Sequence, residues 1–251
     1  MITTVMISNM KDLHSHLLYG IDDGSKSIEE SIQLLKKMRK SGCKEIMITP
    51  HYIRESKYMC NNKDKQKLLD ELNERLKKEK IDVKLYLGNE VFFTAHFMEL
   101  IEKDEIKTLN GSRYFLFEFP MNNVFRNTGE ILSYIISKGY VPVLAHPERY
   151  RMFQEYPDLA EEYLRMGVLL QGNYTSLFGK YGRKPKKLLK YYIKKGWISF
   201  LGSDTHHEFK YKMSRVEAKV KKLNKDEEYI HNLLEGNFDK VINNEVIPMI
   251  R

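Results

Sequence analysis

Hydrophobic and polar positions along the chain repeat one order, an amphipathic helix followed by a short apolar strand. The first helix is predicted at residues 27–40, where Ser27 and Glu30 form a capping box and apolar residues recur at helical spacing. Gly42 ends this helix, and a β-rich run follows at once. The same order returns three more times, so strands are predicted at residues 45–49, 140–144, 168–170 and 197–201. Helices and strands that alternate in this way are typical of an α/β protein with a parallel sheet.

Further apolar segments bring the predicted set to seven strands; these are residues 12–16, 83–87 and 114–117. Most of the seven are apolar throughout, as expected of parallel strands that are covered on both faces. After the last strand, helices are predicted at residues 214–223 and 226–234. No Pro- or Ser-rich linker interrupts the 251 residues, so we expect one domain over residues 1–251, an α/β fold of barrel or layered type.

The composition, 42% hydrophobic and 12% aromatic, is that of a globular chain with one sizeable core. No apolar run approaches the roughly 18 residues that span a bilayer, and residues 1–10 lack the basic region and apolar block of a signal peptide. We therefore expect a cytoplasmic protein that does not insert into the membrane. Cys43 and Cys60 cannot form a disulfide framework, and neither has an arginine six residues later, as a Cys-based phosphatase loop requires.

The net charge of +8 comes mainly from lysine pairs such as Lys36-Lys37 and Lys194-Lys195. These pairs lie between apolar residues at helical spacing, which indicates solvated outer faces of helices. Attraction of an anionic partner is the alternative interpretation, and the charge alone does not decide between them.

Potential metal ligands follow nearly every predicted strand. His14 and His16, two apart in an extended segment, point to the same side and can hold one ion. In a β/α barrel the carboxyl ends of all strands open on one rim, where active sites are built. Glu90 and Glu118 end apolar runs, where an unpaired carboxylate would be costly. The predicted metal ligands are His14, His16, Asp23, His51, Glu90, Glu118, His146, Asp204 and His206.

Asp23 is the candidate with an alternative, because Asp22-Asp23-Gly24 could be a simple turn, and Asp22 could take its place. Histidine and carboxylate ligands without thiolates suit Mn, Fe or Zn. Three divalent cations against four carboxylates would leave about two positive charges, which favours phosphate-ester hydrolysis. Arg149, three residues after His146, is placed to bind phosphate oxygens in a fork, unless it forms a surface ion pair.

These residues carry a family resemblance that covers nearly the whole chain. Asp-Leu-His-Ser-His at residues 12–16, Gly-Asn-Glu ending at Glu90 and Ser-Asp-Thr-His at residues 203–206 resemble the polymerase-and-histidinol-phosphatase (PHP) superfamily. Asp22-Asp23-Gly24 and the run Ala-His-Pro-Glu-Arg-Tyr ending at Tyr150 are closer to its bacterial metal-dependent protein-tyrosine phosphatases of capsule and exopolysaccharide synthesis. The resemblance implies a distorted (β/α)7 TIM-like barrel with three metal ions, usually manganese.

The resemblance also assigns ligands to ions. It gives the first ion His14, His16, Glu90 and Asp204. It gives the second ion Glu90, as a bridge, with Glu118 and His146, and the third Asp23, His51 and His206. With Arg149, the ligands of the third ion are the predicted catalytic residues. The family has a second phosphate-binding arginine near Tyr211, so Lys210 or Lys212 is the predicted substitute, and Arg54 is a further candidate for substrate contact.

The resemblance implies hydrolysis of phosphotyrosine by a metal-activated hydroxide, without a covalent phosphoenzyme. The implied partner is a phosphotyrosine protein, the tyrosine-rich C-terminal tail of a bacterial tyrosine kinase, with any membrane association peripheral and through the kinase complex. A phosphatase of histidinol phosphate or another small phosphomonoester and a non-catalytic metal-stabilised binding module are the alternatives. A nuclease is disfavoured because the sequence shows no pattern that indicates a basic-aromatic groove, so no nucleic-acid partner is expected. The sequence does not identify the group that protonates the leaving group.

Overall fold

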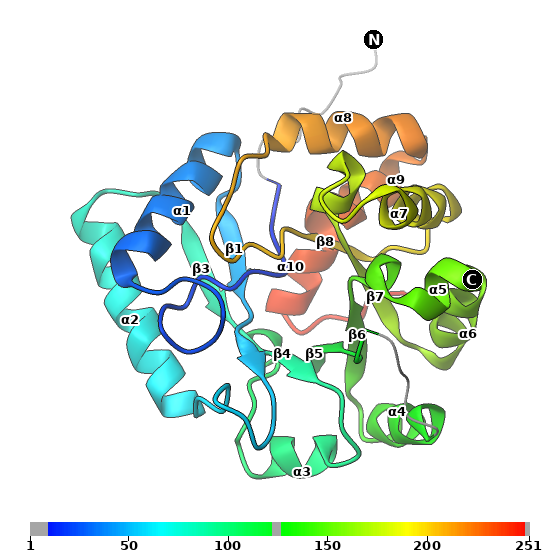
Figure 1. Ribbon diagram of the computed structural model, residues 1–251, viewed down its shortest axis with the longest axis horizontal. Helices are drawn as coiled ribbons and strands as arrows, with labels where there is room; N and C mark the ends of the chain where they lie inside the picture. The colour runs from blue at the N-terminus through cyan, green and yellow to red at the C-terminus, as the bar shows by residue number, and fades with distance from the viewer. Residues whose placement is uncertain (1–9, 122–126, 249–251) are drawn as a thin grey trace.

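A parallel sheet that curls around a central core dominates the computed structural model, which describes residues 10–121 and 127–248 (Figure 1). The strands are β1 (Glu45–Ile48), β2 (His51–Tyr52), β3 (Lys84–Leu87), β4 (Glu90–Phe92), β5 (Tyr114–Glu118), β6 (Val141–Ala145), β7 (Leu169–Asn173) and β8 (Phe200–Gly202). Six of them form one sheet in the order β2-β4-β5-β6-β7-β8, and β1 pairs with β3. Every pairing is parallel.

Two backbone hydrogen bonds connect the smaller sheet to the larger one. Gly88 N donates to Ile48 O at 2.9 Å, and Glu90 N donates to Pro50 O at 3.1 Å. Strands β1 and β2 therefore occupy a single strand position of the barrel, interrupted at Pro50, which has no N–H to donate. Strands β3 and β4 together occupy the next strand position.

Residues 12–16 close the barrel. Asp12 forms a parallel bridge to Ile46 in β1. Ser15 forms a second parallel bridge to Thr205, just after β8. Because this segment makes isolated bridges to two neighbours, it is not a continuous strand, although it occupies the predicted position. The barrel therefore has seven strand positions, and the predicted distorted β/α barrel is confirmed.

Helices form the outer layer (Figure 1). They are α1 (Ile28–Ser41), α2 (Asn62–Lys78), α3 (Phe97–Glu102), α4 (Thr128–Ser137), α5 (Arg151–Glu155), α6 (Leu159–Met166), α7 (Arg183–Lys195), α8 (Met213–Leu223), α9 (Glu227–His231) and α10 (Asn237–Ile242). Shorter turns are η1 (Leu109–Gly111), η2 (Pro147–Arg149), η3 (Tyr174–Phe178) and the π-turn η4 (Asn232–Gly236). None of the helices in the described ranges is long and apolar enough to cross a membrane.

The amino end of the barrel is closed by α10. Phe238 and Val241 of this helix pack with Leu13 and other buried residues inside the barrel. Lys11, just before the closing segment, pairs with Asp239. With this end filled, the opposite rim, where the strands end, is left to form a site.

The predicted element boundaries agree with the structure to within a few residues. Ser27 caps α1 by accepting a hydrogen bond from Glu30 N, and Gly42 follows α1 with φ of 107°. The Glu30 carboxylate, however, accepts from Lys26 N rather than from Ser27 N. The predicted strand 197–201 begins later, at β8, and the predicted helix 226–234 is divided into α9 and η4.

Candidate metal centre

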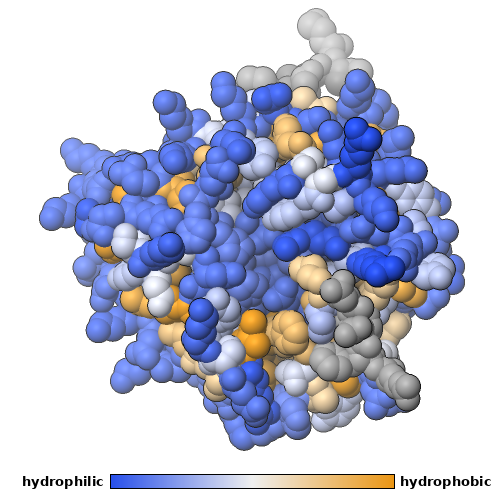
Figure 2. Space-filling view, in the orientation of Figure 1, coloured by the Kyte–Doolittle hydropathy of each residue, from blue (hydrophilic) through white to orange (hydrophobic). Residues whose placement is uncertain are grey.

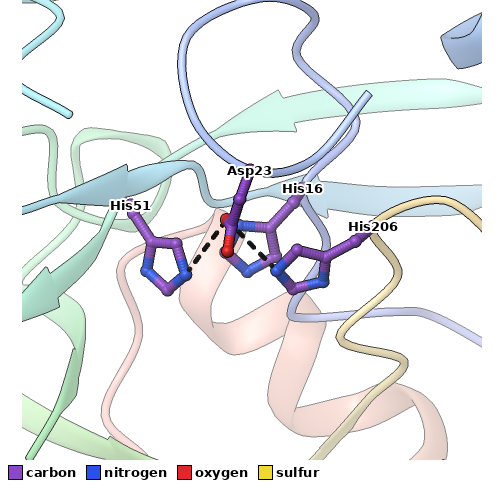
Figure 3. Close-up of side chains that lie close together, drawn as sticks. All are labelled: His16, Asp23, His51 and His206. Carbon is purple, nitrogen blue, oxygen red and sulfur yellow. Dashed lines mark ion pairs between the residues drawn. The ribbon is translucent and has the colours of Figure 1, made fainter. Parts of the chain in front are cut away.

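The predicted ligands come together at the carboxyl rim of the barrel. Each belongs to at least one group of three or four side chains whose donor atoms lie within 4.8 Å of one another. The groups are His14-His16-Asp204, His14-Glu90-His146, His51-Glu90-Glu118 and His16-Asp23-His51-His206. The last group, shown in Figure 3, joins residues from three distant parts of the chain. Figure 2 shows that this face of the molecule is hollowed near its centre and hydrophilic there.

Hydrogen bonds behind the first two histidines fix which ring nitrogen faces the centre. His14 Nδ1 lies 2.8 Å from Gln171 Oε1, and His16 Nδ1 lies 2.8 Å from Asp22 Oδ2. Both partners are acceptors, so each Nδ1 carries the proton and each Nε2 has a free lone pair. The two Nε2 atoms are only 3.0 Å apart. Two lone pairs at this separation repel each other unless a cation lies beside them, so this arrangement fits a metal ion.

Glu90 lies at the middle of the cluster. Its Oε2 is 3.2 Å from His14 Nε2, 3.3 Å from His16 Nε2 and 3.0 Å from His51 Nδ1. Nevertheless, neither Glu90 Oε2 nor His51 Nδ1, both buried, has a partner in hydrogen-bonding geometry among the described residues. Buried polar atoms are rarely left unpaired. Donor atoms that converge without bonding to one another are what a bridging metal ligand needs.

Asp23 and Asp22 have different roles. Asp23 Oδ1 faces His206 Nε2 at 3.4 Å and His51 Nε2 at 3.5 Å, at the wall of the cavity. Asp22 instead uses both oxygens within the protein, accepting from His16, from Gly24 N and from His51 N. The geometry therefore favours Asp23 over Asp22 as the ligand and gives Asp22 the role of orienting His16.

The two oxygens of Asp204 are also divided between two tasks. Oδ2 accepts hydrogen bonds from Arg149 Nη1 at 2.7 Å, Asn173 Nδ2 at 2.8 Å and Tyr181 Oη at 3.0 Å. Oδ1 faces the imidazoles of His206 at 3.4 Å and His16 at 3.6 Å. Three donors thus hold the carboxylate so that one oxygen remains available to a cation.

Backbone strain coincides with two of these residues. His146 has φ of 37° and Asp204 has φ of 53°, both in the left-handed region. This region is unfavourable for residues with a Cβ, and such conformations concentrate at functional sites. Here they turn the chain sharply as it leaves β6 and β8, so that both side chains reach the centre.

Charges within the cluster compensate one another. Burial alone would raise the pKa of Glu90, but the imidazoles of His14 and His51 outweigh it and hold the pKa well below its usual range. Burial would likewise lower the pKa of His14, yet the Glu90 and Asp204 carboxylates raise it. Burial and the nearby Arg149 lower the pKa of His146. Divalent cations would take over this compensation and leave the imidazoles neutral, with lone pairs free to bind metal. This donor set fits ions of the Mn, Fe or Zn type.

A cavity of about 430 Å³ opens over the cluster. Besides candidate ligands, it is lined by Arg149, Lys180, Tyr181, His207 and Glu208. The Arg149 guanidinium carbon lies 4.5 Å from the centre of the Tyr181 ring, so cation–π contact and the bond to Asp204 both orient this side chain.

The other predicted phosphate contacts do not line this cavity. Lys210 Nζ pairs with Glu208 at 3.1 Å, and Lys212 is the N-cap residue of α8. Arg54 pairs with Glu99 at 3.4 Å. Tyr211, near which the resemblance places the family's second arginine, packs on Phe178 with ring centres 5.2 Å apart. Lys180, which the sequence did not single out, is the additional lysine at the cavity wall.

Several supporting residues were also missed by sequence reasoning. Gln171 and Asn173, in the last residues of β7, orient His14 and Asp204. Glu148 accepts from Asn173 N at 2.9 Å and from Ser176 Oγ at 2.8 Å, tying η2 to η3 beneath Arg149. Burial raises the pKa of Glu148 to about 7. Their positions next to recognised motifs were the available signal, but sequence spacing does not reveal which partner each one contacts.

Fold and site together define a class, the parallel β/α barrels with a cluster of histidines and carboxylates at the carboxyl rim. Comparison with known proteins is more specific. The family model described as capsular polysaccharide synthesis, CpsB/CapC, matches residues 10–243, so the chain belongs to this family, as the resemblance predicted.

Individual relatives agree with this assignment. The chain is 36% identical over 198 residues to CapC of Staphylococcus aureus, covering 78% of this chain and 77% of that protein. It is 33% identical over 203 residues to tyrosine-protein phosphatase CpsB of Streptococcus pneumoniae, covering 79% and 83%. Among solved structures, one from the work on YwqE of Bacillus subtilis and CpsB of Streptococcus pneumoniae, described as unique metal-dependent tyrosine phosphatases, matches with a TM-score of 0.86 and 28% identity. This match covers 96% of this chain and 97% of that one.

A more distant match shares the fold alone. The histidinol phosphate phosphatase of Lactococcus lactis has a TM-score of 0.56 at 16% identity, covering 86% of this chain and 93% of that one. The fold alone therefore does not identify the substrate, and the site must do so.

Proposed function

We propose that this chain is a metal-dependent protein-tyrosine phosphatase, a phosphoric monoester hydrolase that does not use a cysteine nucleophile. The observation that carries the proposal is the cluster of nine imidazole and carboxylate side chains beneath an open cavity whose wall presents Arg149. Membership of the CpsB/CapC family, together with relatives named tyrosine-protein phosphatases, supports the same activity.

Divalent cations, three in number and most simply manganese, would be held by the nine residues His14, His16, Asp23, His51, Glu90, Glu118, His146, Asp204 and His206. Such ions lower the pKa of bound water and neutralise charge on phosphate oxygens. Asp22 and Gln171 hold the proton of His16 and His14, respectively, away from the centre, and Glu90 belongs to two of the four groups.

The chain itself supplies cations for the phosphate. Arg149 binds non-bridging phosphate oxygens with the guanidinium N–H groups that Asp204 does not use. Lys180 supplies a second positive charge at the cavity wall, 5.1 Å from the centre of the same Tyr181 ring, in place of the family's second arginine. Contact with the Tyr181 ring limits the directions in which Arg149 can present its donors.

The physiological substrate follows from family and chemistry. We propose a phosphotyrosine protein of capsular polysaccharide synthesis, the tyrosine-rich C-terminal tail of a bacterial tyrosine kinase, acted on in the cytoplasm. A tyrosinate leaving group has a pKa near 10, so it needs only modest help from a proton donor.

The test compares substrates and metals in one preparation. We expect the purified protein to hydrolyse a phosphotyrosine peptide with higher kcat/KM than histidinol phosphate or a phosphoserine peptide. Activity should disappear with a chelator and return on addition of Mn²⁺, with Fe²⁺ and Zn²⁺ as comparisons, and elemental analysis should find the bound metal. Preference for histidinol phosphate, or full activity without metal, would show that the proposal is wrong.

A further inference from the structure

The candidate active site continues into a groove along α7. A second cavity, of about 390 Å³, shares Arg149 and Tyr181 with the first. A third, of about 440 Å³, shares Gln154 and Lys184 with the second. We call these two adjoining cavities the α7 groove; its lining includes Gln154, Pro157, Arg183, Lys184, Lys187 and Tyr191.

The groove is strongly basic. Helix α7 reads Arg-Lys-Pro-Lys-Lys-Leu-Leu-Lys-Tyr-Tyr-Ile-Lys-Lys and contains no acidic residue. Four of its first five residues are cationic, at the helix end whose dipole is positive and where acidic residues are stabilising. This arrangement costs stability, so a role in binding an anion explains it better than a role in folding.

The groove cations also lack counter-ions. Arg183, Lys184 and Lys187 are exposed, and within residues 10–121 and 127–248 none of them forms an ion pair with a carboxylate. Other helices of the same protein do pair their cations, as Arg75 with Glu79 and Arg165 with Glu161. Asp158, the acidic residue of the third cavity, accepts a hydrogen bond from Tyr191 Oη at 2.7 Å and is not paired with the lysines.

We propose that the α7 groove is a docking site for an acidic peptide segment next to the phosphotyrosine, so that the chain selects phosphotyrosines with carboxylates nearby. The inference rests on the proposed function and specifies its substrate class. Shape and continuity both favour a peptide. A peptide whose phosphate lies at Arg149 can extend into the second cavity, which shares Arg149 and contains Lys184. From there it can continue into the third cavity, which contains Lys187. A membrane surface, in contrast, is flat and would not follow a concave groove into the site.

The first experiment compares peptides. Synthetic phosphotyrosine peptides would carry glutamates on the N-terminal side, on the C-terminal side or not at all. We expect one of the acidic peptides to have a KM about five- to ten-fold below that of the neutral peptide at low salt, with similar kcat. Raising KCl from 50 to 500 mM should remove most of this advantage, because exposed charges are screened.

Matched variants locate the effect. Lys184→Gln with Lys187→Gln removes two groove charges, and Lys186→Gln with Lys190→Gln removes two from the same helix on the side facing α8. Burial and repulsion from Lys186 and Lys190 lower the pKa of Lys219 on α8, which places both residues on that side. The groove variant should lose the preference for acidic peptides, and the control variant should keep it within about two-fold.

Three results would overturn the inference. The first is equal KM values for the acidic and neutral peptides, and the second is an equal loss of peptide preference in the two double variants. The third is that the groove variant loses binding to phosphatidylglycerol vesicles but keeps its peptide preference. Turnover of p-nitrophenyl phosphate separates the inference from the proposed function, because this small ester does not reach the groove. If the small ester is hydrolysed and the peptides are not distinguished, only the groove proposal fails. Fluorescence anisotropy of labelled peptides measures the same preference if no turnover is found.

Discussion

Arg149 Nη1 donates to Asp204 Oδ2 at 2.7 Å, which joins the cationic wall of the cavity to the candidate metal cluster. Asp204 is buried and a quarter of the Arg149 side chain is exposed, so the pair connects the protein interior to the open cavity. The contact leaves the other Asp204 oxygen facing His206 and leaves further guanidinium N–H groups facing the cavity. One ion pair thus aligns a ligand for metal and a donor for phosphate.

Replacing Arg149 should therefore impair catalysis more than folding. We expect Arg149→Ala to lower kcat/KM on a phosphotyrosine peptide by about 100-fold, through lost charge-assisted bonds to phosphate. Arg149→Lys should recover part of this loss, because it restores charge but not the fork. Steady-state kinetics measure both, and Arg151→Ala is the control, since Arg151 is exposed and pairs with Glu155 on the same helix. Equal kinetics for the two alanine variants would place Arg149 outside the mechanism.

Lys180 is the second cation at the cavity wall, and replacing Lys180 and Lys210 in turn tests which of the two lysines contacts phosphate. Lys180→Gln should raise KM for a small aryl phosphate about five-fold by removing one partly screened charge. Lys210→Gln should have little effect, because Lys210 is exposed and pairs with Glu208. Competitive inhibition by inorganic phosphate gives an independent measure. If Lys210→Gln has the larger effect instead, the sequence prediction for Lys210 was right.

The repeating helix–glycine–strand pattern was sufficient to predict an α/β fold of barrel or layered type, because most strand residues are buried. The choice of the barrel came from the family resemblance. Strand-end positions were sufficient to predict the cluster, since parallel strands bring their carboxyl ends to one rim. The pattern could not give the closing segment's isolated bridges, which depend on Ile46 and Thr205 far along the chain.

The missed residues have a common physical reason. Lys180 lies just after η3 in a run of ordinary surface residues, and only the path of the chain after β7 brings it to the cavity. Gln171 acts through a hydrogen bond to a residue 157 positions earlier. Side chains that act on another side chain leave no local pattern, so geometry is needed to find them.

Gln171 fixes the tautomer of His14, and its loss should weaken metal binding. Gln171→Leu removes the acceptor of the Nδ1 proton, so the ring can present either nitrogen. We expect metal affinity to fall by about 10- to 100-fold, measured by competition with a chelating dye. Gln66→Leu changes an exposed glutamine that bonds to Asp70 on α2 and should leave affinity unchanged. Unaltered affinity in Gln171→Leu would mean that the His14 tautomer is set in another way.

Metal removal should lower stability as well as activity. Without cations, the facing lone pairs of His14 and His16 and the buried Glu90 lose their compensation. A metal present at 100 times its Kd stabilises the native state by about 2.7 kcal/mol. For a chain of this size the Tm should therefore fall by about 5–10 °C in excess chelator and recover with Mn²⁺. Calorimetry of wild type and of Glu90→Gln tests this expectation, since the Tm of the variant should change little on addition of Mn²⁺.

Lys65 provides a pH-dependent prediction that is independent of the metal ligands. Its side chain is fully buried, and Nζ donates to a neutral acceptor, Asn89 Oδ1, at 2.6 Å. Burial lowers the pKa of the amine from 10.5 to about 8. Between these two values the unfolded chain binds more protons than the folded one, so this group makes the free energy of unfolding rise with pH. The rise is at most about 1.4 kcal/mol per pH unit.

The comparison with Lys65→Met isolates this contribution. Urea unfolding in excess chelator at pH 7.5, 8.5 and 9.5 should show wild type gaining stability relative to the variant as the pH increases. Lys67→Met changes an exposed lysine on the same helix, and its free energy of unfolding should vary with pH in parallel with that of wild type. A constant difference between wild type and Lys65→Met over this range would mean that the buried amine keeps its proton. The bond to Asn89, which lies just before Glu90, would then be a charged one at all three pH values.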